Sequence, residues 1–93
     1  MASGIIKQPT NSLSFTVTLD TTWTNNEQTV ENDPRFISTG FAYIVSPAAT
    51  SRTNYLQADI YADDVSTNGQ MTFHCSAAPG DEITVNILRV VTA

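Results

Sequence analysis

The stretch Leu13-Ser14-Phe15-Thr16-Val17-Thr18-Leu19 decides the fold class of this chain, because apolar and polar residues alternate along it without a break. In an extended strand, successive side chains point to opposite faces. One face of this segment therefore carries only large apolar side chains, and the other carries only Ser and Thr. Such alternation predicts a β-strand with one face buried in a core and the other in solvent.

The same period of two predicts five further strands along the chain. Asn68-Gly69 is a strong tight-turn pair, and in the segment after it Met71, Phe73 and Cys75 alternate with polar residues and are expected in the core. The expected strands are Gln28–Glu31, Phe36–Val45 with a bulge or close backbone approach at Gly40, Tyr55–Tyr61, Gln70–Cys75 and Glu82–Val91. We therefore expect an all-β fold, an antiparallel β-sandwich or open barrel of about six to eight strands.

The 93 residues suffice for one domain, which we expect at residues 13–93 after an N-terminal arm at residues 1–12. Gly4 and Pro9 interrupt any regular pattern in this arm, which we interpret as an attachment segment. A domain of this size buries only about 60–65% of its unfolded surface, so its core is marginal. The single cysteine and single histidine exclude an internal disulfide and a structural zinc site. Oligomerisation is the remaining usual source of stability.

Apolar residues on the second face of the last strand indicate where copies of the chain meet. Ile83, Val85 and Ile87 share one face, but Leu88 and Val90 make the opposite face apolar as well. A strand that is apolar on both faces is central or covered by a partner. Ile5 and Ile6 in the arm also need cover. We therefore expect Ile5, Ile6, Leu88 and Val90 at an oligomer interface.

The net charge of −5 bears on partners and location. Nucleic-acid affinity comes mainly from Lys and Arg that neutralise phosphates, so nucleic acid is not an expected partner. Anionic membrane surfaces are disfavoured for the same reason, and no apolar run approaches the about 20 residues of a membrane span. The N-terminus lacks the basic start and long apolar stretch of a signal peptide, so we expect synthesis in a cytoplasm.

No catalytic residues, metal ligands or cofactor are expected. His74 and Cys75 are neighbours on a predicted strand, so their side chains point to opposite faces and cannot form a nucleophile–base pair. Asp63-Asp64 lacks the alternating ligands of a calcium loop, and we interpret it as a solvated acidic turn. Asp59 and Asp81-Glu82 would form a paired-carboxylate site only if the fold brought them together.

The aromatic residues predict a candidate sugar site. Tyr55, Gln57, Asp59 and Tyr61 share one face of their predicted strand, and this mixture of aromatic and polar groups suits a polyol ligand. Trp23 is a further candidate for the same site. The competing interpretation is that these aromatic side chains pack inside the small core or at a subunit contact.

The order of these segments resembles the small β-domains at the C-terminal tips of bacteriophage tail and head fibres. The resemblance spans roughly residues 13–91. It is carried by Phe15–Leu19 with Trp23, by Val65–Cys75 with its Gly69 turn and Phe73-x-Cys75, and by Pro79, Asp81 and the closing strand Ile83–Val90.

The resemblance implies a homotrimer, an architecture related to sugar-binding lectin domains, and a virion location. We therefore expect a non-enzymatic virion structural protein, a capsid decoration or a head or tail fibre domain, that contacts other virion proteins and contributes to host attachment through surface glycans. Met1 stands only a dozen residues before the domain, which favours a separate small decoration protein over the tip of a long fibre. The alternative is a stand-alone carbohydrate-binding, lectin-like module.

Overall fold

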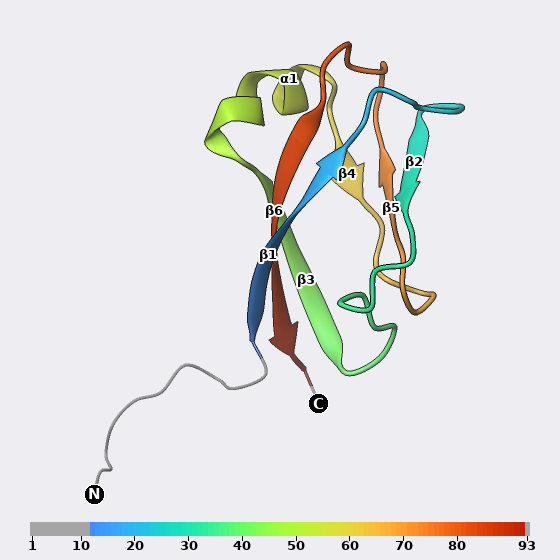
Figure 1. Cartoon of the computed structure of the whole chain (residues 1–93), viewed down its shortest axis with the longest axis vertical. Coiled ribbons are helices and arrows are strands. Elements are labelled where there is room, and N and C mark those ends of the chain that lie inside the picture. Colours follow the sequence, from blue (N-terminus) through green and yellow to red (C-terminus); the bar gives the residue numbers. More distant parts are fainter. Residues whose placement is uncertain (1–11, 93) are drawn as a thin grey trace, which may run out of the picture.

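The computed structural model describes residues 12–92, which form two three-stranded antiparallel sheets and one short α-helix (Figure 1). The first sheet has the strand order β1-β6-β3 and the second has the order β2-β5-β4. The strands are β1 (Leu13–Leu19), β2 (Glu27–Val30), β3 (Phe41–Pro47), β4 (Tyr61–Ala62), β5 (Met71–His74) and β6 (Ile83–Val91), and a 3-10 turn (Ala49–Ser51) leads into helix α1 (Arg52–Gln57). The prediction of a small all-β domain with antiparallel strands is confirmed.

The two ends of the described chain meet in the first sheet. β6 is the central strand, and β1 pairs with it from Leu13 opposite Arg89 to Leu19 opposite Ile83. β3 pairs with the other edge of β6, from Phe41 opposite Val91 to Pro47 opposite Val85. The strand expected from the alternating stretch is therefore present with the same bounds, and its Ser and Thr side chains are exposed as expected.

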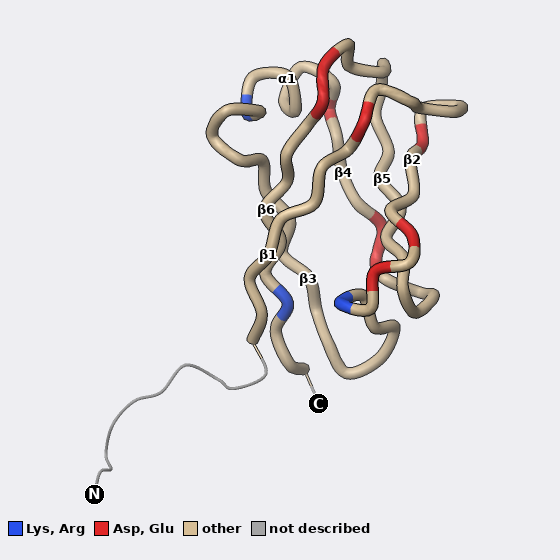
Figure 2. Tube along the Cα trace, in the orientation of Figure 1, with Lys and Arg blue, Asp and Glu red and all other residues tan. Residues whose placement is uncertain are grey.

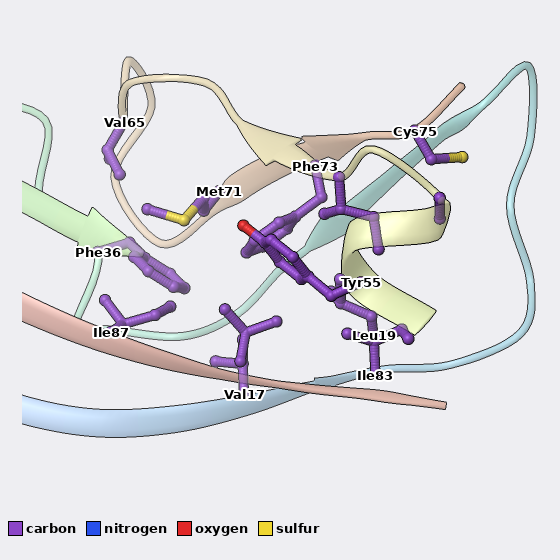
Figure 3. Close-up of a cluster of buried hydrophobic side chains, with 13 residues drawn as sticks. Val17, Leu19, Phe36, Tyr55, Val65, Met71, Phe73, Cys75, Ile83 and Ile87 are labelled. Carbon is purple, nitrogen blue, oxygen red and sulfur yellow. The ribbon is translucent and has the colours of Figure 1, made fainter. Parts of the chain in front are cut away.

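The core lies between the two sheets (Figure 3). Leu19, Ile83 and Val85 of the first sheet and Phe73 of the second have no exposed surface at all. The prediction that Met71, Phe73 and Cys75 point inward is confirmed, because each is at most 7% exposed. Burial of this kind stabilises a fold by about 25 cal/mol per Å² of apolar surface, so these side chains hold the sheets together.

Residues Tyr55–Tyr61 do not form the expected strand, and this prediction is wrong. Arg52–Gln57 is helical, and Tyr55 is its buried residue. Together with the buried residues at its two caps, Ser51 and Ala58, Tyr55 follows the three-to-four residue spacing of a helix. Asp59 then ends the helix in a left-handed conformation with φ of 54°, and its backbone N–H donates to the carbonyl of Leu56. The apparent period of two was fortuitous in so short a segment.

The predicted strand Phe36–Val45 is present only in its second half. β3 begins at Phe41, directly after Gly40, whose φ of 85° belongs to a turn and not to a bulge within a strand. Phe36 lies in the preceding loop and is 1% exposed, with its ring 5.6 Å from that of Phe15. The apolar residue that suggested a strand is therefore a loop side chain that closes one end of the core.

An ion pair between Arg35 and Asp33 holds this loop against Phe15 of the first sheet. Two guanidinium nitrogens of Arg35 donate to the two carboxylate oxygens of Asp33, at 2.8 Å and 2.6 Å. The guanidinium also lies 4.1 Å from the centre of the Phe15 ring. Hydrogen bonds from Arg35 lower the pKa of the Asp33 carboxyl below its usual value, because they stabilise the ionised form.

We expect Asp33→Asn to lower the free energy of unfolding at neutral pH by about 1–2 kcal/mol, since it removes charge-assisted hydrogen bonds that are partly screened by solvent. The folded-state pKa of Asp33 is depressed, so its contribution is fully present above the unfolded value of about 3.9 and is lost as the pH falls through the folded value. Urea unfolding from neutral pH down to about pH 2 should show the two proteins converging. Asp64→Asn, at an exposed position, is the control; a difference that persists unchanged in acid would contradict this role of the carboxylate.

Candidate interaction surfaces

The residues expected to form one sugar site lie in separate places. Trp23 is half-buried against the core, and its indole N–H is enclosed without a hydrogen-bond partner among residues 12–92. Tyr55 points into the core from α1, whereas Gln57 and Asp59 are exposed at the end of the helix. Tyr61 alone presents an exposed aromatic ring, with 55% of its surface accessible. The shared strand face of these residues is therefore a wrong prediction, and its cause is the helix.

Tyr61 belongs instead to a polar row that crosses the outer face of the second sheet. Tyr61 on β4 and Glu27 on β2 both pair directly with His74 on β5. Directly paired residues share a face, and the rings of Tyr61 and His74 stack with their centroids 4.9 Å apart and their planes 17° from parallel. The Nε2 atom of His74 hydrogen-bonds to Asp63 Oδ2 at 2.7 Å, and its Nδ1 atom lies 3.9 Å from Glu27 Oε2.

His74 and Asp63 were not among the residues expected to form a site. The period of two placed His74 on the outer face, and the structure confirms this position. Its contacts with Tyr61 and Asp63 could not be predicted from the sequence, because β4 is only two residues long and shows no strand pattern of its own. Among residues 12–92 no group of three or more His, Cys, Asp or Glu side chains is arranged to hold a metal ion.

A cleft opens beside Tyr61, where β3 and β4 form the neighbouring edges of the two sheets. Its volume is about 220 Å³. Tyr43 and Val45 line it from β3, Tyr55 from α1, and Tyr61 from β4, with Ala62, Asp63, Asp64 and Met71 completing the wall. The cleft therefore combines aromatic and aliphatic walls with two carboxylates, and no Lys or Arg of residues 12–92 lines it.

A larger and shallower depression of about 640 Å³ lies beside β2. Asp20, Glu27 and Glu31 contribute carboxylates to it, and the remaining lining residues are polar. Gln28 holds the adjoining loop, since its side-chain oxygen accepts from the Asp20 N–H and its side-chain N–H donates to the carbonyls of Asp20 and Thr22. No aromatic ring lines this depression, so it offers no platform on which a flat ligand could stack.

The outer face of the first sheet carries no charged residue, and we call it the neutral face. Leu88, the expected interface residue at its centre, is 38% exposed, and Val90 is half-buried. Ile44 on β3 pairs directly with Leu88 and is 58% exposed, although it was not among the expected residues. The neutral face consists of Ser14, Thr16, Thr18, Ala42, Ile44, Ser46, Thr84, Asn86, Leu88 and Val90.

No acidic residue lies within the strands of the first sheet, although Asp20 directly follows β1 and Glu82 directly precedes β6. The acidic residues of the described chain gather along β2 and the loops of the second sheet and at the end of the molecule near α1 (Figure 2). Arg89 is the only charged residue within the strands of the first sheet, and it faces inward over the ring of Phe41 at 4.4 Å. The expected interface residues Ile5 and Ile6 lie outside the described residues.

His74 and Cys75 point to opposite sides of β5, as expected from their adjacency. Cys75 is buried, and burial raises the pKa of its thiol, so little thiolate forms at neutral pH. His74 instead faces the carboxylates on the outer surface. These two residues therefore form no nucleophile–base pair. Among residues 12–92 no helix is long and apolar enough to cross a membrane.

Comparison with known proteins gives no relative from which a function can be transferred. No family model, curated protein or solved structure matches the chain. The two sheets, the neutral face and the cleft beside Tyr61 are therefore interpreted from their own residues.

Proposed function

We propose that this chain is a non-enzymatic structural protein of a bacteriophage virion, either a capsid decoration or a head or tail fibre domain, and that it assembles with further copies of itself. The neutral face is the single observation that carries the self-assembly. Exposed Ile44 and Leu88 lie side by side at its centre, and apolar surface of this kind is stabilised when it is covered.

The distribution of charge favours a second copy of the chain as the occupant of this face. Two molecules with a net charge of −5 repel each other wherever their acidic surfaces approach. The strand residues of the neutral face bring no carboxylate toward a partner, so copies that meet through them avoid like-charge repulsion. The Ser, Thr and apolar side chains of this face can pack against further copies without burying a charge.

The virion assignment and the trimer rest on the resemblance to fibre-tip domains. The contribution to host attachment rests on the same resemblance, and the exposed Tyr61 ring supports it. The second candidate function, a stand-alone carbohydrate-binding module, is favoured by the same ring. A virion location can be tested directly, because antibodies against the purified protein should label intact particles in the electron microscope.

The mass of the purified chain in solution tests the proposed assembly. Light scattering at micromolar concentration should give a mass about three times the 10.1 kDa of one chain. A mass of two chains would retain self-assembly through the neutral face and reject the trimer. A single-chain mass that persists as the protein is concentrated would overturn the proposal that copies of this chain cover the face.

A further inference from the structure

We propose that the cleft between β3 and β4 binds a single uncharged sugar ring of a surface glycan. This inference rests on the host-attachment part of the proposed function and names the ligand class and the residues that recognise it. The cleft is smaller than the depression beside β2, and aromatic rings line the cleft but not that depression.

The size of the cleft limits the ligand to a small one. Its volume of about 220 Å³ is below the about 300–1,000 Å³ of sites for drug-sized ligands, so it accommodates one sugar residue rather than an extended chain. Ala62, Val45 and Met71 provide aliphatic surface. Such surface suits the C–H groups of a sugar ring and leaves the hydroxyl groups to find polar partners.

Tyr61 supplies an aromatic platform at the mouth of the cleft. One face of its ring is covered by the imidazole of His74, and this stacking holds the ring upright on the sheet. The remaining surface is accessible and borders the cleft. An exposed aromatic ring that is already held in place stacks on a ligand without losing side-chain freedom.

Asp63 and Asp64 supply acceptors for sugar hydroxyl groups. His74 Nε2 binds Oδ2 of Asp63 at 2.7 Å, which fixes the carboxylate and leaves its other oxygen for a ligand. Two carboxylates with no Lys or Arg in the lining repel an anionic sugar. The cleft therefore selects neutral sugars over sialic or uronic acids.

Tyr55 is the third polar group of the cleft and gives independent support for a ligand. The residue is only 9% exposed, and burial alone raises the pKa of its hydroxyl. Within residues 12–92 this hydroxyl makes no hydrogen bond, yet it is not sealed from solvent. It points from α1 toward the side of the core where Met71 lies, and both residues line the cleft (Figure 3). The hydroxyl of Tyr55 is thus free to bond with a group that enters the cleft, and a sugar hydroxyl can take the place of water there.

The alternative is that the three tyrosines serve packing alone. Tyr43 is of this kind, because its hydroxyl accepts from the Ile37 N–H at 2.7 Å and donates to the Arg35 carbonyl at 3.0 Å. Tyr43 therefore lines the cleft with its ring but offers no free hydroxyl to a ligand. Tyr55 and Tyr61 lack such bonds among the described residues, and this difference separates the binding residues from the structural one.

Saturation-transfer NMR with the whole chain tests the site. The probes are the methyl glycosides of glucose, galactose, mannose and N-acetylglucosamine, with methyl sialoside as the anionic control. We expect at least one neutral glycoside to bind with a Kd of about 1–10 mM, as is usual for a small ligand with few contacts. The sialoside should give no saturation transfer.

Four variants assign the binding to the cleft. Tyr61→Ala and Asp64→Asn should each weaken binding at least about tenfold, whereas Tyr61→Phe should keep it within about threefold because the ring remains. Tyr55→Phe should weaken binding about threefold or more with an unchanged fold, which a packing role would not do. Leu56→Ala, on the exposed side of α1 and outside the cleft lining, is the matched control and should bind as the parent does.

Two results would overturn the sugar site. One is the absence of saturation transfer from every neutral glycoside well above the expected Kd, and the other is binding that survives Tyr61→Ala unchanged. Measuring the mass of the same samples separates the two proposals. An oligomer that binds no sugar rejects the sugar site and keeps the self-assembly, whereas a monomer that binds sugar keeps the sugar site and rejects the self-assembly.

Discussion

Phe73→Ala is expected to bring the protein close to unfolding at room temperature. Phe73 has no exposed surface, lies in the central strand of the second sheet, and points toward the first sheet (Figure 3). Truncation of a buried Phe to Ala costs about 3–5 kcal/mol, because transfer free energy is lost and a cavity remains. Domains of this size are stable by about 5–15 kcal/mol, so the loss is a large share of the total.

Urea unfolding followed by circular dichroism measures this loss. With a slope of about 1–2 kcal/mol per M, the midpoint of Phe73→Ala should fall by about 1.5–5 M. Phe73→Leu keeps most of the volume and should lower the midpoint by about a third as much. Leu56→Ala also removes a large apolar side chain, but one that is 57% exposed, and its midpoint should move little. Equal shifts for Phe73→Ala and Leu56→Ala would contradict the placement of Phe73 at the centre of the core.

Strand positions in this chain were predictable wherever a long segment alternates. Leu13–Leu19 and the inward-facing residues of β5 and β6 needed nothing beyond the period of two, because half-burial of a strand imposes that period. The pairing of these strands was not predictable. β1 lies beside β6, some 70 residues later in the sequence, and alternation says nothing about which strand is the neighbour.

The short elements α1 and β4 were not predicted, for a different reason. The six-residue helix contains only one buried residue, Tyr55, so a helical spacing cannot be recognised within it. Its flanking buried residues, Ser51 and Ala58, reveal the helix only once Asp59 is known to adopt a positive φ. β4 has two residues and depends on its pairing with β5. Both errors fall on the segment that was expected to bind sugar.

Residues of the candidate sites were predictable only where the strand that carries them was predicted correctly. Leu88 and Val90 could be placed on the outer face of β6 because the inner face of this strand was already clear, and their part in an interface stays a prediction. Ile44 was missed because the start of its strand was placed at Phe36, which obscured the alternation of Ala42, Ile44 and Ser46. The cleft of Tyr55, Tyr61 and Asp64 joins the helix, the shortest strand and a loop, so only the folded chain brings these residues together.

Leu88→Glu is expected to convert the assembled protein into single chains. Leu88 lies at the centre of the neutral face, so self-association through this face would place carboxylates of neighbouring copies near one another in a desolvated contact. Unpaired buried charges of like sign cost several kcal/mol. We expect this cost to exceed the favourable free energy of association of the contact, so the copies separate. Light scattering should then give the 10.1 kDa of one chain at all concentrations tested. The fold should survive, because Leu88 is already 38% exposed.

Leu56→Glu is the matched control, since it introduces the same charge in place of the same residue at an exposed position outside the neutral face. Its mass should equal that of the parent chain. A folded Leu88→Glu protein that keeps the parent mass would show that copies meet elsewhere. Mixing Leu88→Glu with Leu88→Lys is the sharper version of the test, because opposite charges then face each other across the contact. Recovery of the larger mass only in the mixture would assign the interface to the neutral face itself, since a general loss of stability in either variant cannot be repaired by the other.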